Sequence, residues 1–184
     1  MAKLNHVYKA LKDFEQKVIK ASREKLKKLN KDSTGKLSQS IEGDVQEFEN
    51  SIRIFFKMED YGFYQDQGVK GIKSNYIENK NSQFQFKKGI PNTKMINSLE
   101  TWIKNKGMKG RDKKTGRFIT NKSLTFILAR SIFNKGIKAS YFFTEPFNRH
   151  FEKLPDLLID KYGLDMEELF DDIVIENFKK LNNE

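Results

Sequence analysis

The chain has 184 residues, enough for one ordinary domain with an appended helical piece. It contains no cysteine, which excludes disulfides, thiolate nucleophiles and cysteine-based metal sites and is typical of a reducing cytoplasm. No apolar run approaches the roughly 20 residues that a membrane span needs, and the first residues carry no apolar signal segment. We therefore expect a soluble protein made in the cytoplasm, with no membrane partner.

The net charge of +10 is unevenly distributed. From Glu152 onward, ten acidic and four basic residues give a net charge of −6, so the first 151 residues carry +16. A positive body and a negative end predict attraction to an oppositely charged surface. That surface is either nucleic acid or another copy of the same protein arranged head to tail.

The first third of the chain predicts a helix, two strands and a short helix. Apolar residues spaced by three, four and seven predict an amphipathic helix over residues 3–29, with lysines on its opposite face. Residues 36–48 and 50–58 have strand patterns and are expected to pair antiparallel. Residues 59–68, "EDYGFYQDQG", predict a short helix that ends on its last glycine.

The middle of the chain predicts a long loop and two helices. Residues 69–92 are rich in glycine and asparagine and are interpreted as a long loop with a role in binding, with a hairpin over residues 82–89. A helix is expected over residues 92–107, followed by a basic loop or tight hairpin. Residues 121–136 predict a second helix, whose inward stripe is Leu124, Ile127, Leu128, Ile132 and Phe133.

The end of the chain predicts an extended segment and two helices. Pro146 is expected to begin a helix that runs to about Tyr162. Asp165 is expected to cap a closing acidic helix. The apolar residues of that closing helix are Leu169, Ile173 and Phe178.

Residues suited to catalysis are scarce. The two histidines, His6 and His150, lie near opposite ends of the chain and are interpreted as ordinary helix residues. Metalloprotease, calcium-loop, phosphate-loop and nucleophile-elbow motifs are absent from the sequence. We expect no enzymatic activity, no cofactor and no metal site. One acidic cluster is interpreted as a solvated or partner-facing surface: Glu167, Glu168, Asp171 and Asp172.

The strongest charge feature is the segment 104–117. Basic residues on a glycine-spaced loop can follow a phosphate backbone, bind an acidic protein surface, or simply keep the chain soluble. Phe118 is the one aromatic residue nearby, and neither a helix-turn-helix nor a zinc-finger pattern is visible in the sequence. Any DNA contact would therefore be non-specific. The candidate interaction residues of this segment are Arg111, Lys113, Lys114 and Arg117.

Two short motifs carry a resemblance to a known family. The stretch "TGKLSQSI", two strands and then "DYGFYQDQG" resemble the head–tail joining and tail-completion proteins of tailed bacteriophages. The second motif departs from the family at Gly62, Asp66 and Val69. A later stretch, "IKASYFFTEPF", is similar to the family's closing motif, with Tyr141 in place of a proline. The matching residues are Thr34, Gly35, Lys36, Leu37, Ser40, Ile41, Tyr61, Tyr64, Gly68, Lys138, Ala139, Phe142 and Phe143. Three of them, Tyr61, Tyr64 and Gly68, are further candidate interaction residues.

The resemblance implies an α+β fold: a long N-terminal helix, a small antiparallel sheet with helices packed on it, and C-terminal helices. It covers residues 1–155 with an enlarged middle over 69–137, leaving 156–184 as an acidic helical extension. The residue style is also similar to ring proteins in the necks of crAss-like phages. The implied role is a structural virion protein, a neck or tail ring that binds copies of itself and adjoining portal, neck and tail proteins. The alternative function is a small basic DNA-binding protein.

Overall fold

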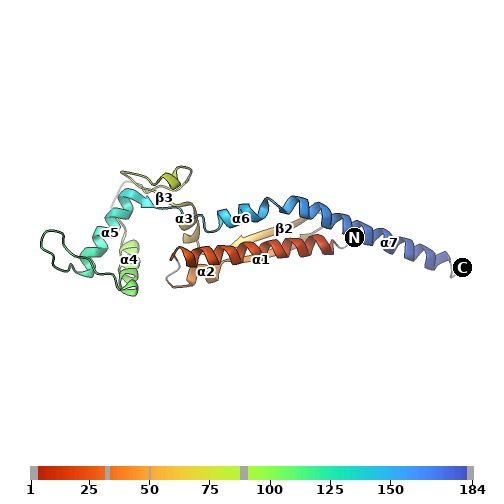
Figure 1. Cartoon of the computed structure of the whole chain (residues 1–184), viewed down its shortest axis with the longest axis horizontal. Helices are drawn as coiled ribbons and strands as arrows, with labels where there is room; N and C mark the ends of the chain where they lie inside the picture. Colours follow the sequence, from red (N-terminus) through yellow and green to blue (C-terminus); the bar gives the residue numbers. More distant parts are fainter. Residues whose placement is uncertain (1–3, 32–33, 50, 88–90, 182–184) are drawn as a thin grey trace. The chain divides into compact units, whose positions relative to one another are not determined.

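The computed structural model describes residues 4–31, 34–49, 51–87 and 91–181, with side chains as far as residue 176. The fold is α+β, as predicted (Figure 1). In chain order the elements are α1 (Asn5–Lys28), α2 (Lys36–Ser40), β1 (Glu42–Phe48), β2 (Ser51–Lys57), α3 (Tyr61–Gln67), β3 (Val69–Lys70), the 3₁₀ helix η1 (Ile77–Asn79), α4 (Thr93–Lys106), α5 (Asn121–Lys135), β4 (Gly136–Ile137), α6 (Thr144–Phe151) and α7 (Leu154–Leu181).

The chain folds into two compact units, each assembled from separated segments. Unit 1 contains residues 1–24, 41–57 and 143–184, and unit 2 contains residues 25–40 and 58–142. α7 begins at Leu154 and runs without a break past residue 155, where the sequence analysis placed the start of the helical extension, and that boundary stays a prediction. None of the helices in the described ranges combines the length and apolar character needed to cross a bilayer.

Unit 1 has an apolar core between its long helices and its hairpin. Leu11, Phe14 and Val18 form the buried stripe of α1, as the predicted helix requires. They cluster with Val45 of β1 and Leu154 of α7. Figure 1 shows α1 running alongside the hairpin and the α6–α7 segment.

Phenylalanine rings fill the centre of unit 1. The ring centroid of Phe14 lies 5.6 Å from that of Phe147, and the centroid of Phe56 lies 5.2 Å from that of Phe143. Both pairs meet edge to face, the geometry that the quadrupoles of aromatic rings favour. Each such pair contributes about 0.5–1.5 kcal/mol beyond the burial of its area.

The predicted antiparallel pairing of β1 and β2 is confirmed. Val45 lies opposite Ile54, and every second residue of β2 is partly buried, which gives the alternation expected of a half-buried strand. A side chain at Gly43 would collide with Glu15 of α1, because a Cβ atom there would lie 2.4 Å from the Glu15 Cγ atom. Glycine therefore allows α1 to approach the hairpin closely.

The strand predicted to begin at residue 36 is partly wrong, because residues 36–40 form helix α2. Gly35 has a φ of 71°, a left-handed conformation that suits glycine at the turn before the helix. The hydroxyls of Ser38 and Ser40 donate to the carbonyls of Gly35 and Leu37 at 3.1 and 2.9 Å. These local hydrogen bonds satisfy the backbone without a strand partner.

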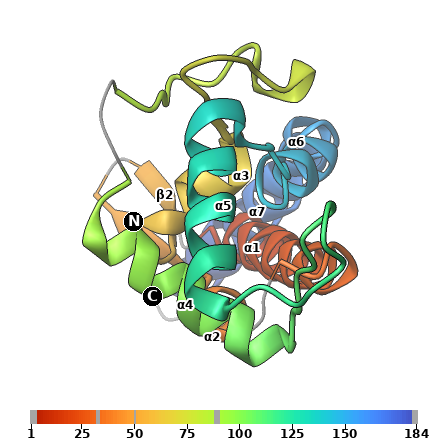
Figure 2. The same cartoon turned by 90° about the vertical axis from the view of Figure 1, so that its left-hand side faces the viewer.

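Helices α4 and α5 form where they were predicted, and they lie against each other in unit 2 (Figure 2). The Asn92 side chain accepts a hydrogen bond from the Met95 N–H at 2.8 Å, and Gly107 closes α4 with a φ of 61°. The predicted inward stripe of α5 is wrong at Ile127, which is 57% exposed. The buried positions are instead the small residues Thr125 and Ala129.

The hairpin predicted over residues 82–89 does not form within residues 82–87, and residues 88 and 89 lie outside the described ranges. The Lys70 N–H donates to the Phe84 carbonyl at 2.9 Å, and the Phe86 N–H donates to the Lys70 carbonyl at 3.0 Å. Residues 84–86 therefore pair with β3, which also pairs antiparallel with β4. A partner distant in sequence replaces the local turn.

The predicted helix from Pro146 to Tyr162 is divided in two. α6 begins at Thr144, so that Pro146 occupies its first turn, where a missing N–H costs nothing. α7 begins at Leu154 and continues unbroken through Asp165. Pro155 explains the break, since a proline near a helix start cannot continue the preceding helix.

Candidate assembly surfaces

Unit 2 carries a strongly basic surface on the α4–α5 hairpin. Residues 93–135 contain eleven basic and two acidic residues, a net charge of +9. The four basic residues among the predicted interaction residues, Arg111, Lys113, Lys114 and Arg117, are exposed on the segment that joins the two helices. The structure therefore brings these four together on one short stretch of backbone.

That segment is an ordered tight turn, one of the two predicted alternatives. Arg111 pairs with Phe118 across the turn, with its guanidinium 4.3 Å from the ring centroid. The Asp112 carboxylate accepts hydrogen bonds from the N–H groups of Thr115 and Lys114 at 2.8 and 2.9 Å. Hydrogen bonds from the backbone and side chain of Thr115, and then from Lys114, lower the pKa of Asp112. The one acidic residue of the loop thus shapes the turn that presents its basic residues.

A groove lies along α5 on unit 2. Its apolar lining includes Phe126 and Ile127, both exposed, and the partly buried Phe133. Three of its lining residues are basic: Lys73, Arg130 and Lys135. The whole lining is Lys73, Pro91, Phe126, Ile127, Arg130, Ser131, Phe133, Asn134 and Lys135. We call this feature the α5 groove.

Helix α7 has two apolar stripes, and one of them is exposed. Leu154 and Leu158 pack on the core of unit 1. A second stripe has spacings of three, four, four and three and is mainly solvent-exposed, with Ile159 70% and Phe170 66% accessible. This exposed stripe consists of Ile159, Tyr162, Met166, Phe170 and Ile173.

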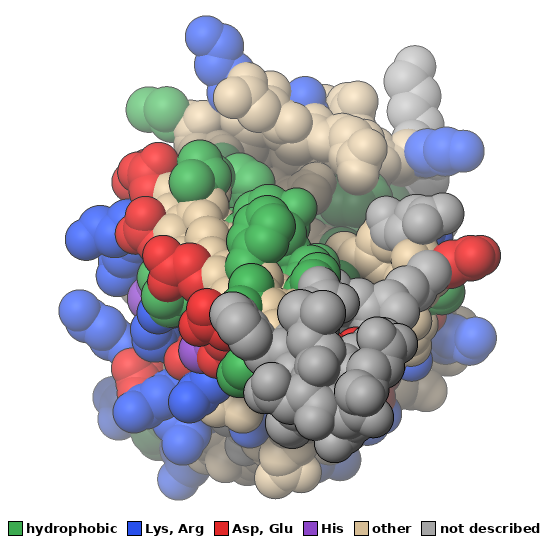
Figure 3. All heavy atoms as spheres, turned by 90° about the vertical axis from the view of Figure 1, so that its right-hand side faces the viewer, with side chains coloured by type: hydrophobic (Ala, Val, Ile, Leu, Met, Phe, Trp, Pro, Cys, Tyr) green, Lys and Arg blue, Asp and Glu red, His purple; other side chains and the backbone are tan. Residues whose placement is uncertain are grey.

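Acidic residues accompany the exposed stripe of α7. Asp156, Asp160, Glu167 and Asp171 are spaced by four, seven and four, which places them in one row along the helix. Figure 3, which faces the right-hand side of the view in Figure 1, shows a band of hydrophobic side chains with acidic side chains beside it. The predicted acidic surface is thus exposed, and it borders exposed apolar side chains that include Ile173, one of the apolar residues named for the closing helix.

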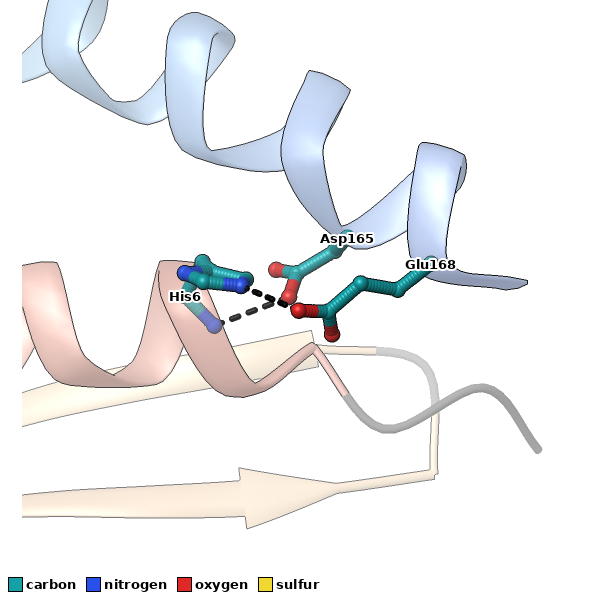
Figure 4. A group of neighbouring side chains, drawn as sticks. All are labelled: His6, Asp165 and Glu168. Atoms are coloured by element: carbon teal, nitrogen blue, oxygen red, sulfur yellow. Dashed lines mark hydrogen bonds and ion pairs between the residues drawn. The ribbon is translucent and has the colours of Figure 1, made fainter. Parts of the chain in front are cut away.

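His6, Asp165 and Glu168 meet where α1 begins (Figure 4). The Asp165 carboxylate accepts hydrogen bonds from the N–H groups of His6 and Val7 at 2.8 and 3.0 Å. The predicted role of Asp165 as the cap of its own helix is therefore wrong, because it lies inside α7 and caps α1 instead. Its side chain is almost fully buried, with the residue 3% exposed. Asp165 ties the first turn of α1 to α7.

The same cluster brings His6, interpreted from the sequence as an ordinary helix residue, next to the acidic residues of α7. The His6 Nε2 atom lies 2.8 Å from a carboxylate oxygen of Glu168, 162 residues away in the sequence. The ligating atoms of His6, Asp165 and Glu168 all lie within 4.8 Å of one another, and imidazole and carboxylate are ligands for divalent transition metals. Both Asp165 oxygens accept backbone N–H groups, so the cluster caps the first turn of α1.

Two of the residues matched to the phage family, Gly68 and Ala139, contact a buried polar hub in unit 2. Tyr61 and Tyr64 are exposed on α3, and the ring centroid of Tyr64 lies 4.6 Å from that of Phe84. Gly68 is buried with a φ of 74°, and a Cβ atom there would lie 2.7 Å from the Ala139 nitrogen. The two matched motifs, near residues 68 and 139, are therefore in contact.

Asn79 is the centre of this hub and was not identified from the sequence. Its amide nitrogen donates to the carbonyls of Val69 and Ile137 at 2.9 and 2.7 Å, and its oxygen accepts from the Ala139 N–H at 2.8 Å. An asparagine in a loop rich in asparagine gives no sequence signal of burial, because its partners come from segments up to 60 residues away. The hub fixes β3 to β4.

Comparison with known proteins gives no match for this chain among family models, curated proteins or solved structures.

Proposed function

We propose that this chain is a structural virion protein of a tailed bacteriophage, a ring component of the neck or tail that joins the portal to the tail. It acts by protein–protein contact, without catalysis or a cofactor. Its partners are copies of itself and the adjoining portal, neck or tail proteins. It is made in the cytoplasm of the host bacterium and then incorporated into the virion.

The observation that carries the proposal is the presence of two complementary surfaces on one chain. The α4–α5 hairpin is basic, α7 is acidic, and both expose large apolar side chains. Exposed apolar patches of this kind mark interaction sites. Two different complementary surfaces give a heterologous contact between copies, which closes into a ring when the rotation is right.

The position of the matched motifs supports the same assignment. The family resemblance rests on segments near residues 34–41, 61–68 and 138–143. Hydrogen bonds from the N–H groups of Ser140 and Tyr141 to the Asp66 carbonyl, at 3.0 and 2.9 Å, join the second and third segments. Motifs distant in the sequence are thus part of one structural joint, as expected if they specify a common fold.

Deletion of the gene from its phage tests the proposal. We expect filled heads and separate tails to accumulate, with joined particles restored by a plasmid copy. The wild-type virion should contain the chain, in a fixed stoichiometry that mass spectrometry of purified particles can measure. Normal joined virions that lack the chain would contradict the proposal.

A second candidate function, non-specific DNA binding, is favoured by the basic turn alone. Lys113, Lys114 and Arg117 are exposed there with neighbouring glycines, so a phosphate backbone can reach them. The same contact could be made with DNA in the channel of a ring. If the isolated chain binds duplex through this turn, neutralising four phosphates gives a log–log salt slope of roughly −3.6. Weak binding without that slope would favour assembly.

A further inference from the structure

We propose that the exposed stripe of α7 in one copy binds in the α5 groove of a second copy. The inference rests on the proposed self-assembly and names the two surfaces that make it. The two partners are then an amphipathic helix and an apolar groove edged by positive charge.

The helix side has the pattern of a groove-binding helix. Ile159, Tyr162, Met166 and Phe170 follow one another at spacings of three, four and four, so they project along a single line for about three turns. They lie away from Leu154 and Leu158, which are engaged in the core of unit 1. Docking of the stripe therefore leaves the fold of unit 1 unchanged.

The groove side offers matching chemistry. Phe126, Ile127 and Phe133 supply apolar surface, which the stripe would remove from water. The charged residues among the groove's lining are Lys73, Arg130 and Lys135, all of them basic. They complement the row Asp156, Asp160, Glu167 and Asp171 beside the stripe.

Charge and topology favour a second copy as the occupant. α7 (Leu154–Leu181) has eight acidic and three basic residues, a net charge of −5, against +9 on residues 93–135. Because every copy carries one helix and one groove, two copies joined by one contact leave one helix and one groove free. The contact therefore repeats from copy to copy, as a ring requires.

The absence of cysteine from the chain permits a direct test by disulfide formation. One preparation carries Val174→Cys beside the stripe, and the other carries Ser131→Cys in the groove. Mixed under mild oxidation, the two should form a disulfide-linked heterodimer identified by its cross-linked peptide. We expect it to form at least about tenfold faster than a control pair of Val174→Cys with Ser51→Cys, which is exposed on β2.

Equal rates for the two pairs would overturn the inference. A single chain that carries both Val174→Cys and Ser131→Cys distinguishes folding back of α7 on its own groove. If its disulfide closes within the monomer at every concentration, the second copy is the wrong occupant. If it gives a concentration-dependent ladder of linked chains, the contact between copies is supported.

Charge exchange provides a control against misfolding. Arg130→Glu with Lys135→Glu reverses the groove, and Asp160→Lys with Asp171→Lys reverses the helix. When both cysteine-bearing chains carry the same reversal, cross-linking should be about tenfold slower, because like charges then face each other across the contact. A reversed helix mixed with a reversed groove should restore the wild-type rate. Failure of this rescue, with circular dichroism unchanged, would also overturn the inference.

The outcome is separable from that of the proposed function. Joined virions that depend on the chain, together with no preferential cross-link, would keep the structural role and assign assembly to other surfaces. A preferential cross-link in a chain dispensable for virion joining would keep the contact and remove the phage role.

Discussion

In unit 1 the central contacts are apolar, with Leu11, Phe14 and Val18 of α1 packed on the hairpin and α7. Unit 2 also buries apolar residues, but it adds the fully buried Asn79, which binds three backbone groups. Apolar packing tolerates small shifts, since it depends on contact area and shape. A buried amide requires partners in fixed directions and is costly when one is lost.

The difference shows what holds separated segments together in each unit. α1 supplies unit 1 with a long stripe that can be recognised from its spacing. Unit 2 depends on a joint between β3, η1 and β4, each only two or three residues long. Such short elements bury little area, so hydrogen-bond geometry has a larger share in fixing their positions.

The largest effect on the apolar side of the comparison is expected for Phe14→Ala. It removes a buried ring that contacts Phe56 and Phe147, and should lower the free energy of unfolding by about 4 kcal/mol. Urea denaturation followed by circular dichroism measures the change. Phe55→Ala, on the exposed side of β2, is the control and should cost less than about 1 kcal/mol. Equal costs would show that the aromatic cluster is not the core of unit 1.

On the polar side, Asn79→Leu should lower the free energy of unfolding by about 3 kcal/mol. Leucine has the same branching but is larger, and two carbonyls and the Ala139 N–H lose their partner in a buried position. Hydrogen exchange should show faster exchange at Ala139 in particular. If the variant keeps wild-type stability and slow exchange there, the hub is not what fixes β3 to β4.

Asp165→Ala tests whether unit 1 also depends on a polar contact. Loss of the cap on the His6 and Val7 N–H groups should cost about 1–2 kcal/mol. Glu168→Ala removes an exposed ion pair with His6 and should cost less than about 1 kcal/mol. Thermal unfolding of both variants gives the comparison. If Glu168→Ala lowered the stability more than Asp165→Ala does, the ion pair with His6 would be the more important contact of the cluster.

A pH dependence is expected from His150 of α6. Burial, and then the nearby charges of Lys17 and Arg149, lower the pKa of His150 below 6.5 in the folded protein. The unfolded chain therefore binds the proton first as pH falls. The stability contribution is present above about pH 6.5 and is lost as pH falls toward the folded pKa. His150→Gln should remove this part of the fall in melting temperature between pH 7 and pH 5. If the variant shows the same fall in melting temperature as the wild type, the expected role of His150 is contradicted.

The smallest effect on stability is expected in the basic turn. Reversing Arg111, Lys113, Lys114 and Arg117 to Glu should change the free energy of unfolding by about 0.5 kcal/mol or less, because all four are exposed. Head–tail joining should nevertheless fail, because the reversed charges would repel the acidic surface of the adjoining protein that the basic turn is proposed to contact. Tight, steeply salt-dependent DNA binding by the wild-type monomer, with joining intact in the variant, would contradict this reading. The matched control is the reversal of Lys9, Lys20, Lys27 and Lys57.

Local patterns determined much of the fold. The stripe of α1, the alternation of β2, and the caps Asn92 and Gly107 of α4 all follow from neighbours within a few residues. The same holds for the basic turn, whose charge is a property of composition. These features are predictable because helix and strand periodicity and end-capping act over short stretches of chain.

Tertiary structure decided which side of each helix is buried and which polar groups meet. Ile127 and Ile173 belong to apolar helical stripes, yet both are exposed. Thr125 and Asp165, which are polar, are buried. Apolar periodicity in the sequence predicts which residues share a face of a helix, but it does not predict whether that face packs on the core. Asp165 caps α1 through the N–H of His6, 159 residues earlier, because the end of a helix accepts any carboxylate that packing brings within hydrogen-bond distance.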